Sequence, residues 1–212
     1  MVKGKTALKF VFFSFIFLVW SIPQLLFAPS LNLSSISKNS IVEIASYELI
    51  QHTKKVQEKQ LFNAFVSLYE PYIEMIPKAY RVTVINLCWR YNVPISLLYN
   101  LVEKESSWNP KAVSSINPNG SYDRGLMQIN TYSQKTLVAK YYSGSTPFDP
   151  YKYQDSLEVG IRYLNHLYSV YNSWEMALWA YNAGYTRVND NCIPYTTKEY
   201  ARDILDNMKR EA

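Results

Sequence analysis

A glutamate at the end of an apolar helical stripe sets the strongest limit on how this chain folds. Leu97, Leu101 and Glu105 are four residues apart and Val102 adds to the stripe, so a carboxylate closes the last turn of a predicted helix. Burial in such surroundings disfavours the ionised form and raises the pKa of Glu105. A carboxyl group that stays protonated near neutral pH is what a general acid requires. The alternative is a helix-end carboxylate that turns out to water, as is expected for Glu103.

A polar turn followed by a short hairpin or tight loop is predicted downstream of this helix. The turn is Asn-Pro-Asn-Gly at 117–120, and an alternating pattern of side chains follows it. Asp123 supplies a second carboxylate in this loop, and Gln128 enters the next element. We expect Asp123 to point toward a cleft shared with Glu105 and to stay more solvated than it. An ion pair with Arg124 that only fixes the loop is an equal alternative.

Four sequence blocks together resemble the lytic transglycosylases of bacterial cell walls. The blocks are Glu105-Ser106, Gly125-Leu126-Met127-Gln128, Ala180-Tyr181-Asn182-Ala183-Gly184, and Pro194 with Thr197 and Tyr200. Their order and spacing match that family over about residues 78–205. The resemblance implies an all-α, lysozyme-like domain with a small β-hairpin or loop. It also implies that Glu105 is catalytic, with Asp123 as a second candidate, and that the substrate-binding residues are Ser114, Met127, Gln128, Tyr181, Asn182 and Tyr200.

The residue types fit this implication, and most have a structural alternative. A tyrosine ring suits the face of a sugar while its hydroxyl takes a hydrogen bond. An amide offers donor and acceptor groups to N-acetyl and hydroxyl groups. The alternatives are core tyrosines at 181 and 200, hydrogen bonds from Gln128 and Asn182 to loop backbone, and a simple turn residue at Ser114.

The sequence leaves three functions open. Residues 119–123 depart from the small residues of the commonest transglycosylase pattern, and resemble both secretion-associated transglycosylases and animal-type lysozymes, whose second carboxylate stands at Asp123. The first function is nonhydrolytic cleavage of the bond between N-acetylmuramic acid and N-acetylglucosamine in peptidoglycan, giving 1,6-anhydromuramoyl ends, with Glu105 as acid and then base. The second is hydrolysis by Glu105 and Asp123. The third is a noncatalytic wall-binding or assembly protein.

The N-terminal segment predicts export. Residues 1–28 contain three lysines, no acidic residue and an apolar run over 10–28, which is typical of a signal peptide or signal anchor. We favour an anchor because Leu26 and Pro29 give a poor cleavage context around Ala28. The expected location is the periplasm or cell envelope, with N-terminal membrane contact through residues 10–28. Peptidoglycan strands are the expected partner, with a secretion or envelope machine as a further one.

One folded domain at 78–212 is expected after a tether and an amphipathic helix over 29–77. Apolar residues from Ile41 to Tyr72 predict this helix at about 41–70, and nothing in the sequence assigns it a function. Further helices are predicted at 79–91, 94–105, around 157–171, 174–183 and 198–210.

Composition argues against nucleic-acid binding, thiol catalysis and bound metal. The net charge is +5, but without residues 1–28 it is 19 basic minus 17 acidic residues, or +2, with no long basic run. Cys88 lies on an apolar face and Cys192 in a loop, and a bridge between them is allowed in an exported chain but not favoured. No histidine arrangement activates a cysteine and no metal-ligand spacing occurs, so no cofactor is expected.

Overall fold

The computed structural model describes residues 38–210, which are mainly helical. The chain divides into two compact units, residues 1–57 and 58–212, and the second unit contains every candidate site residue. The predicted signal or anchor segment, 1–28, and most of the tether lie outside the described residues. Among residues 38–210, no helix is both long and apolar enough to cross a membrane.

The predicted helix at 41–70 is present as α2 (Lys38–Leu68), but it is not amphipathic. Ile44, Val56 and Leu61 are all exposed. Apolar residues spaced four apart drift around a helix by about 40° at each step, so a stripe of this kind moves away from its starting face. The shorter helix α3 (Glu70–Met75) follows, with Pro71 in its first turn, where a proline removes no helical hydrogen bond.

The globular unit begins before the predicted boundary at residue 78. The rings of Phe62 and Phe65 pack against Trp89, with centroid separations of 5.5 and 5.3 Å. Tyr72 is buried in the core. Aromatic side chains that precede residue 78 therefore complete the domain core.

Two helices deliver the key glutamate. The predicted pair is confirmed as α4 (Arg81–Tyr91) and α5 (Ile95–Ser106), separated at Asn92 in a left-handed conformation (φ 51°). The apolar stripe of α5, including Leu97 and Leu101, is fully buried, and burial of a leucine side chain stabilises a fold by about 1.5–3 kcal/mol. Packing thus fixes the helix that ends at the candidate site.

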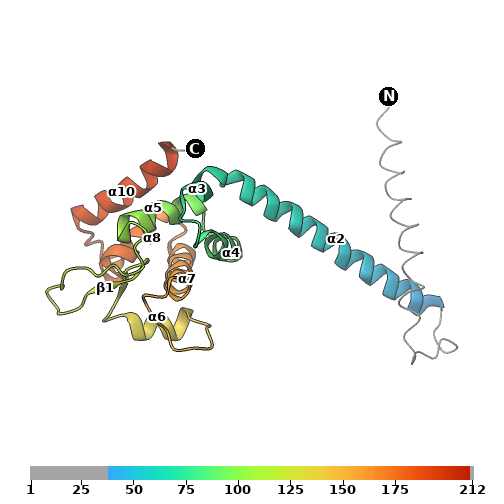
Figure 1. Cartoon of the computed structure of the whole chain (residues 1–212), viewed down its shortest axis with the longest axis horizontal. Coiled ribbons are helices and arrows are strands. Elements are labelled where there is room, and N and C mark those ends of the chain that lie inside the picture. The colour runs from blue at the N-terminus through green and yellow to red at the C-terminus, as the bar shows by residue number, and fades with distance from the viewer. Residues whose placement is uncertain (1–37, 211–212) are drawn as a thin grey trace. The chain divides into compact units, whose positions relative to one another are not determined.

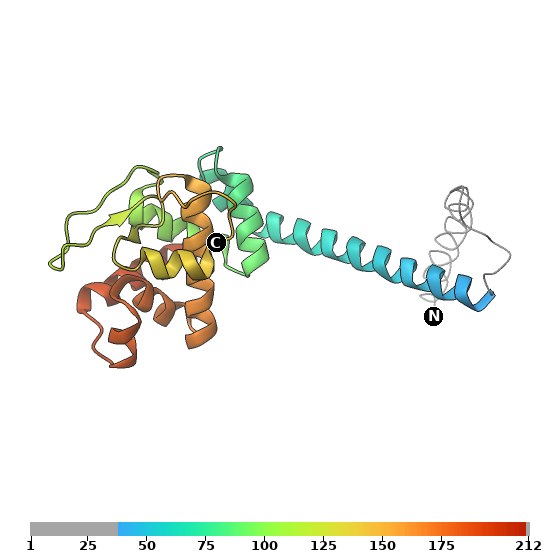
Figure 2. The ribbon, with the colours of Figure 1, turned by 90° about the horizontal axis from the view of Figure 1, so that it is seen from below.

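The C-terminal half of the domain consists of further helices (Figures 1 and 2). α7 (Tyr153–Tyr171), α8 (Trp174–Ala183) and α10 (Tyr195–Arg210) confirm three predicted helices. Ser173 caps α8 by accepting a hydrogen bond from the Met176 amide. α7 packs against α4, α6 and α8, and α10 packs against α5 and α8. The sequence did not predict α6 (Gln134–Tyr141) or α9 (Tyr185–Asn189).

A small antiparallel hairpin stands at one edge of the domain (Figures 1 and 2). β1 (Asp123–Arg124) pairs with β2 (Ile129–Asn130), so that Asp123 lies opposite Asn130. The predicted fold class, mainly α with a small hairpin, is confirmed.

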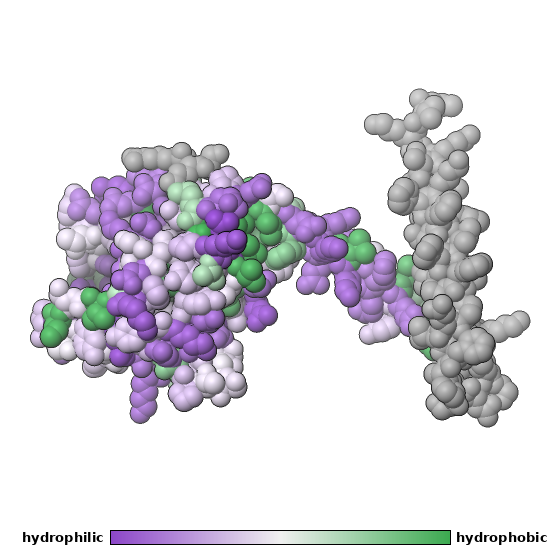
Figure 3. All heavy atoms as spheres, viewed as in Figure 1, coloured by the Kyte–Doolittle hydropathy of each residue, from purple (hydrophilic) through white to green (hydrophobic). Residues whose placement is uncertain are grey.

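Apolar side chains are concentrated inside the domain, and the face seen in Figure 3 is largely hydrophilic. Cys88 is fully buried, as predicted, whereas Cys192 is exposed, and both thiols are free. Burial raises the pKa of the Cys88 thiol far above its usual value.

Candidate active site

Burial and two neighbouring side chains shift the pKa of the Glu105 carboxyl group. Leu101 and Val102, fully buried, precede it on α5, and the Tyr200 hydroxyl donates a hydrogen bond to Glu105 Oε1. Burial raises the pKa of Glu105 to about 7; the Tyr200 hydrogen bond opposes this rise, and the negative charge of Asp123 adds to it. The predicted pKa rise through desolvation is confirmed, and Glu103 is exposed as expected.

The loop after β1 is fastened against α5. Ser106 Oγ donates to the carbonyl of Leu126 at 3.0 Å, which joins the helix end to this loop. Gly125 has a φ of 76°, and a Cβ there would lie 1.9 Å from the carbonyl oxygen of Pro150. Only glycine adopts this φ readily and leaves room for the Pro150 carbonyl, so Gly125 allows the two backbone segments to lie close together.

Met127 does not contact the cleft, and the predicted substrate contact by its side chain is wrong. The side chain is fully buried against Gly160, where an added Cβ would lie 2.6 Å from Met127 Cε. Its carbonyl instead accepts a hydrogen bond from the Tyr181 hydroxyl at 2.8 Å. Met127 therefore holds Tyr181 from within the core.

A cleft of about 680 Å³ lies beside the hairpin. Asp123, Gln128, Tyr181 and Asn182, all predicted site residues, line it. Much of the remaining lining shares amide or hydroxyl groups, from Asn117, Asn119, Ser121, Asn130, Tyr132, Ser133 and Tyr163. Such a lining offers many neutral donors and acceptors, which suits hydroxyl and N-acetyl groups.

Glu105 and Tyr200 are not part of this lining, although both were expected there. Tyr200 is 8% exposed, and its hydroxyl is directed at Glu105 rather than at the open cleft. Glu105 nevertheless lies within electrostatic range of two residues that line the cleft. Burial raises the pKa of Tyr181 and the charge of Glu105 adds to this rise, while the charge of Asp123 acts on Glu105. The site therefore consists of a carboxyl group set behind an amide-lined cleft.

Asp123 is held by neutral partners and not by Arg124. Its Oδ1 accepts a hydrogen bond from Asn130 Nδ2 at 2.7 Å, and its Oδ2 accepts one from Ser114 Oγ at 3.3 Å. The Arg124 guanidinium donates instead to Gln134. The ion-pair alternative for Asp123 is therefore wrong, and its carboxylate faces the cleft.

The amide and hydroxyl side chains predicted to bind substrate all form hydrogen bonds within the domain. Gln128 Nε2 donates to the carbonyl of Gly125 at 2.9 Å, and Asn182 Oδ1 accepts from Thr197 Oγ1 at 2.8 Å. Ser114 Oγ accepts from the Asp123 amide at 2.9 Å. These bonds fix the side chains structurally, and Gln128 and Asn182 also line the cleft.

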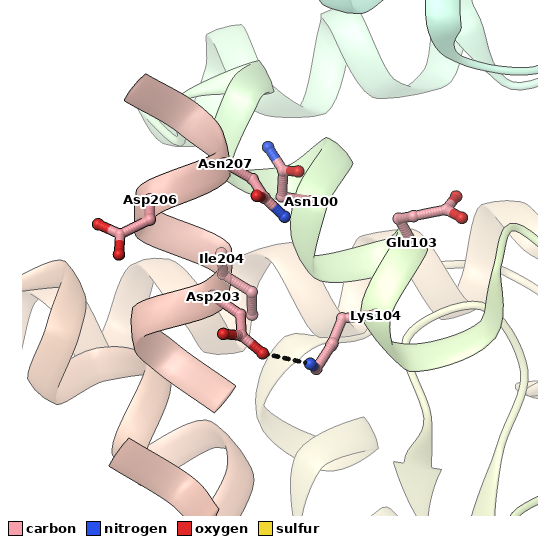
Figure 4. Close-up of a pocket in the computed structure, with 7 residues that line it drawn as sticks. All are labelled: Asn100, Glu103, Lys104, Asp203, Ile204, Asp206 and Asn207. Carbon is pink, nitrogen blue, oxygen red and sulfur yellow. Dashed lines mark hydrogen bonds and ion pairs between the residues drawn. The ribbon is translucent and has the colours of Figure 1, made fainter. Parts of the chain in front are cut away.

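A second hollow, of about 360 Å³, lies between α5 and α10 (Figure 4). Glu103 lines it, and the ion pair between Lys104 Nζ and Asp203 Oδ2, at 2.7 Å, crosses it. The hollow has no aromatic side chain and does not include Glu105. Two glutamates on one helix thus face different surroundings: Glu103 is exposed, whereas Glu105 is half-buried.

The sequence did not identify several residues that shape the site. Asn130, at the end of the Gln-Ile-Asn segment, fixes Asp123, and Tyr163 packs against Tyr181 with ring centroids 5.7 Å apart. Arg187 lines the cleft from α9, three residues after the third sequence block. Tyr163 lies within the helix predicted around 157–171, where spacing alone does not distinguish an aromatic residue that lines a cleft from one in the core.

Comparison with known sequences finds a family match over most of the globular unit. Residues 83–204 match the Transglycosylase SLT domain. Protein IpgF of Shigella flexneri is 39% identical, over 59% of this chain and 81% of IpgF. Invasion protein IagB of Salmonella typhimurium is 33% identical, over 58% of this chain and 76% of IagB.

Solved structures share the fold. The 70-kDa soluble lytic transglycosylase SLT70 of Escherichia coli has a TM-score of 0.55 at 22% identity, over 73% of this chain and 29% of that chain. An inactive glutamate-to-glutamine mutant of the lytic transglycosylase Slt of Pseudomonas aeruginosa has a TM-score of 0.53 at 20% identity, over 64% and 24%. The chain therefore spans less than a third of the length of either solved protein.

Proposed function

Because this chain belongs to the Transglycosylase SLT domain family, a family of peptidoglycan lytic transglycosylases, we propose that its globular unit cleaves peptidoglycan strands without water. The bond cleaved joins N-acetylmuramic acid to N-acetylglucosamine, and the product is a 1,6-anhydromuramoyl end. Glu105 is the proposed catalytic residue.

The observation that supports this proposal is the pKa of Glu105, raised to about 7 beside an amide-lined cleft. A carboxyl group in that range is protonated often enough to give a proton and ionised often enough to take one back. The amide and hydroxyl groups that make up most of the cleft lining suit an uncharged glycan backbone. Glu103, two residues earlier on the same helix, is exposed and does not line this cleft.

The proposed reaction uses one carboxyl group twice. Protonated Glu105 donates to the oxygen that links the two sugars, the bond from that oxygen to the muramoyl anomeric carbon breaks, and N-acetylglucosamine leaves with its hydroxyl restored. The acetamido oxygen of the muramoyl sugar stabilises the positive anomeric carbon. Ionised Glu105 then takes the proton from the muramoyl 6-hydroxyl, whose oxygen attacks that carbon. The proton balance closes, and no water is consumed.

Two neighbours have supporting roles in this proposal. Tyr200 orients Glu105 through its hydrogen bond and stabilises the ionised form, because a hydroxyl donates more strongly to a carboxylate than to a neutral acid. Asp123 acts in the opposite direction, because its negative charge favours the protonated form of Glu105. Together they adjust the proton affinity of Glu105, which burial raises.

Asp123 also supports a second candidate, hydrolysis of the lysozyme type. Its carboxylate faces the cleft and is close enough for its charge to act on Glu105. A retaining hydrolase uses such a second carboxylate as nucleophile or stabiliser. In this structure Asp123 Oδ1 already accepts a hydrogen bond from Asn130 Nδ2, which lowers the nucleophilicity of that oxygen and favours the transglycosylase proposal.

Replacement of single carboxyl groups tests the proposal. We expect Glu105→Gln to lower the rate of peptidoglycan cleavage by about 10²–10⁴-fold, the usual contribution of a general acid–base group. Glu103→Gln, two residues earlier on the same helix but exposed, is the matched control and should retain the wild-type rate. Full activity of purified Glu105→Gln would overturn the assignment.

We further propose that the protein acts in the periplasm or cell envelope, held at the inner membrane by residues 10–28 and working beside a secretion or envelope machine. The proposal rests on the lysines and apolar run of residues 1–28 and on the similarity to Invasion protein IagB. Fractionation of cells that produce the full chain and a chain without residues 10–28 tests it. Equal amounts of both chains in the membrane fraction would contradict the anchor.

A further inference from the structure

The cleft contains a cation that the proposed mechanism does not use. Among the residues that line it, the charged side chains are Asp123 and Arg187. Asp123 is engaged by Asn130 and Ser114, as described above. Arg187 is exposed, and its guanidinium forms no hydrogen bond or ion pair with residues 43–208, whose side chains are described. An exposed arginine that has no protein partner and lines the cleft is available to bind an anionic group of the ligand.

The backbone that presents Arg187 is fixed. Gly184, with a φ of 90°, turns the chain sharply between α8 and α9. Val188, the next residue after Arg187, is buried in the core, and Asn189 Oδ1 accepts a hydrogen bond from the Tyr171 hydroxyl at 3.0 Å. Arg187 therefore projects from an anchored turn and not from a loose loop.

Arg187 lines the same cleft as Tyr181 and Asn182 and follows them along the chain. Tyr181, whose pKa is affected by Glu105, and Asn182 come from the end of α8, and Arg187 comes from α9 directly after it. A muramoyl sugar whose anomeric carbon lies at Glu105 carries its lactyl group and stem peptide away from the reacting bond. That peptide must leave the cleft past one of its walls.

Stem peptides bring carboxylates to a glycan that is otherwise uncharged. Guanidinium groups bind carboxylates through two parallel hydrogen bonds, which are stronger and more directional than neutral ones. We propose that Arg187 binds a carboxylate of the stem peptide, so that the cleft prefers peptide-bearing strands over strands from which the peptides have been removed. This inference rests on the proposed function, because it assumes a muramoyl sugar at Glu105.

The test compares two substrates that differ in the peptide. Intact peptidoglycan strands carry stem peptides, whereas amidase-treated strands keep only the lactyl carboxylate. We expect Arg187→Gln to lower kcat/KM on intact strands about tenfold, equivalent to about 1.4 kcal/mol, and on stripped strands by less than about twofold. Arg187→Lys keeps the charge but loses the paired hydrogen bonds, so its kcat/KM on intact strands should lie between those of the wild type and Arg187→Gln. Arg90→Gln removes an exposed arginine outside the cleft lining and should change neither rate.

Three results would overturn the inference. They are no loss on intact strands, an equal loss on both substrates, which would assign Arg187 to the lactyl carboxylate or to the glycan itself, and equal wild-type rates on intact and stripped strands. Circular dichroism and thermal melting of each variant establish that it is folded, and Arg187→Lys keeps the test valid if Arg187→Gln does not fold.

A binding experiment separates this inference from the proposed function. Affinity for intact and stripped strands is measured in the Glu105→Gln chain, with and without Arg187→Gln, so that no turnover is needed. We expect the intact strand to bind about tenfold more weakly when Arg187 is replaced, and the stripped strand to bind equally. Absence of anhydro products from the wild type would refute the proposed function while leaving this comparison readable. Unchanged affinity for intact strands would refute the inference alone.

Discussion

Replacing Glu105 by glutamine should make the domain more stable at alkaline pH while removing its activity. The pKa of Glu105 rises from 4.5 to about 7 on folding, chiefly because burial penalises the charged form. The folded state therefore binds this proton more tightly than the unfolded state. The stabilisation from protonated Glu105 is complete below about pH 4.5 and is lost as the pH rises through about 7.

The size of the effect follows from the shift. Each pKa unit corresponds to about 1.4 kcal/mol, so ionised Glu105 costs the folded state up to about 3 kcal/mol above pH 7. Glutamine has nearly the same shape and does not ionise, so it avoids this cost at every pH. For a domain of this size the gain corresponds to a rise in Tm of roughly 6–12 °C.

Thermal and urea denaturation at about pH 4 and about pH 8.5 measure this difference. The two chains should have equal stability at the lower pH, and Glu105→Gln should exceed the wild type at the higher pH. Other groups titrate in both chains and cancel in the comparison. The control is Glu103→Gln, which replaces an exposed side chain and should not gain stability as the pH rises. A stability difference for Glu105→Gln that does not change with pH would refute the argument that burial raises the pKa of Glu105.

Further predictions concern the neighbours of Glu105 and the core beneath them. Tyr200→Phe removes the hydrogen bond that stabilises ionised Glu105, so the alkaline limb of the kcat/KM profile should move to higher pH by about one unit, and an unmoved limb would contradict this. Asp123→Asn removes the charge that raises the pKa of Glu105, so the same limb should move to lower pH, with activity reduced but not abolished; a loss as deep as that of Glu105→Gln would favour hydrolysis instead. Gly160→Ala should destabilise the domain by about 1–3 kcal/mol in urea denaturation, because its Cβ would lie 2.6–2.7 Å from Met127 atoms, and unchanged stability would contradict this contact.

Much of the fold is predictable because several of its helices bury apolar residues at regular helical spacing. α5 and α7 have clear apolar periodicity, and α8 has a serine cap, so spacing and capping identify them. α6 has no buried residue, and α9 contains five residues, so neither produces a periodic signal. The prediction that α2 has one apolar face was wrong, because residues spaced four apart move gradually around a helix.

The candidate site is predictable in its residue types but not in their directions. Sequence identifies Glu105 because burial disfavours a charge at the end of an apolar stripe, so a carboxyl group there indicates a function. It does not reveal that the Met127 side chain points into the core while its carbonyl holds Tyr181. It also does not reveal that Tyr200 donates to Glu105, since these residues are 95 positions apart and meet only through tertiary packing.

Digestion of purified peptidoglycan in water labelled with a heavy oxygen isotope, followed by mass spectrometry of the fragments, tests the central claim most directly. If Glu105 serves as acid and then base with the muramoyl 6-hydroxyl as nucleophile, wild-type digests should contain 1,6-anhydromuramoyl ends without the label. The Glu105→Gln digest should contain few new ends of either kind, and Glu103→Gln should match the wild type. Labelled reducing ends from the wild-type protein would contradict the account, because they show that water, and not the 6-hydroxyl, attacks the anomeric carbon.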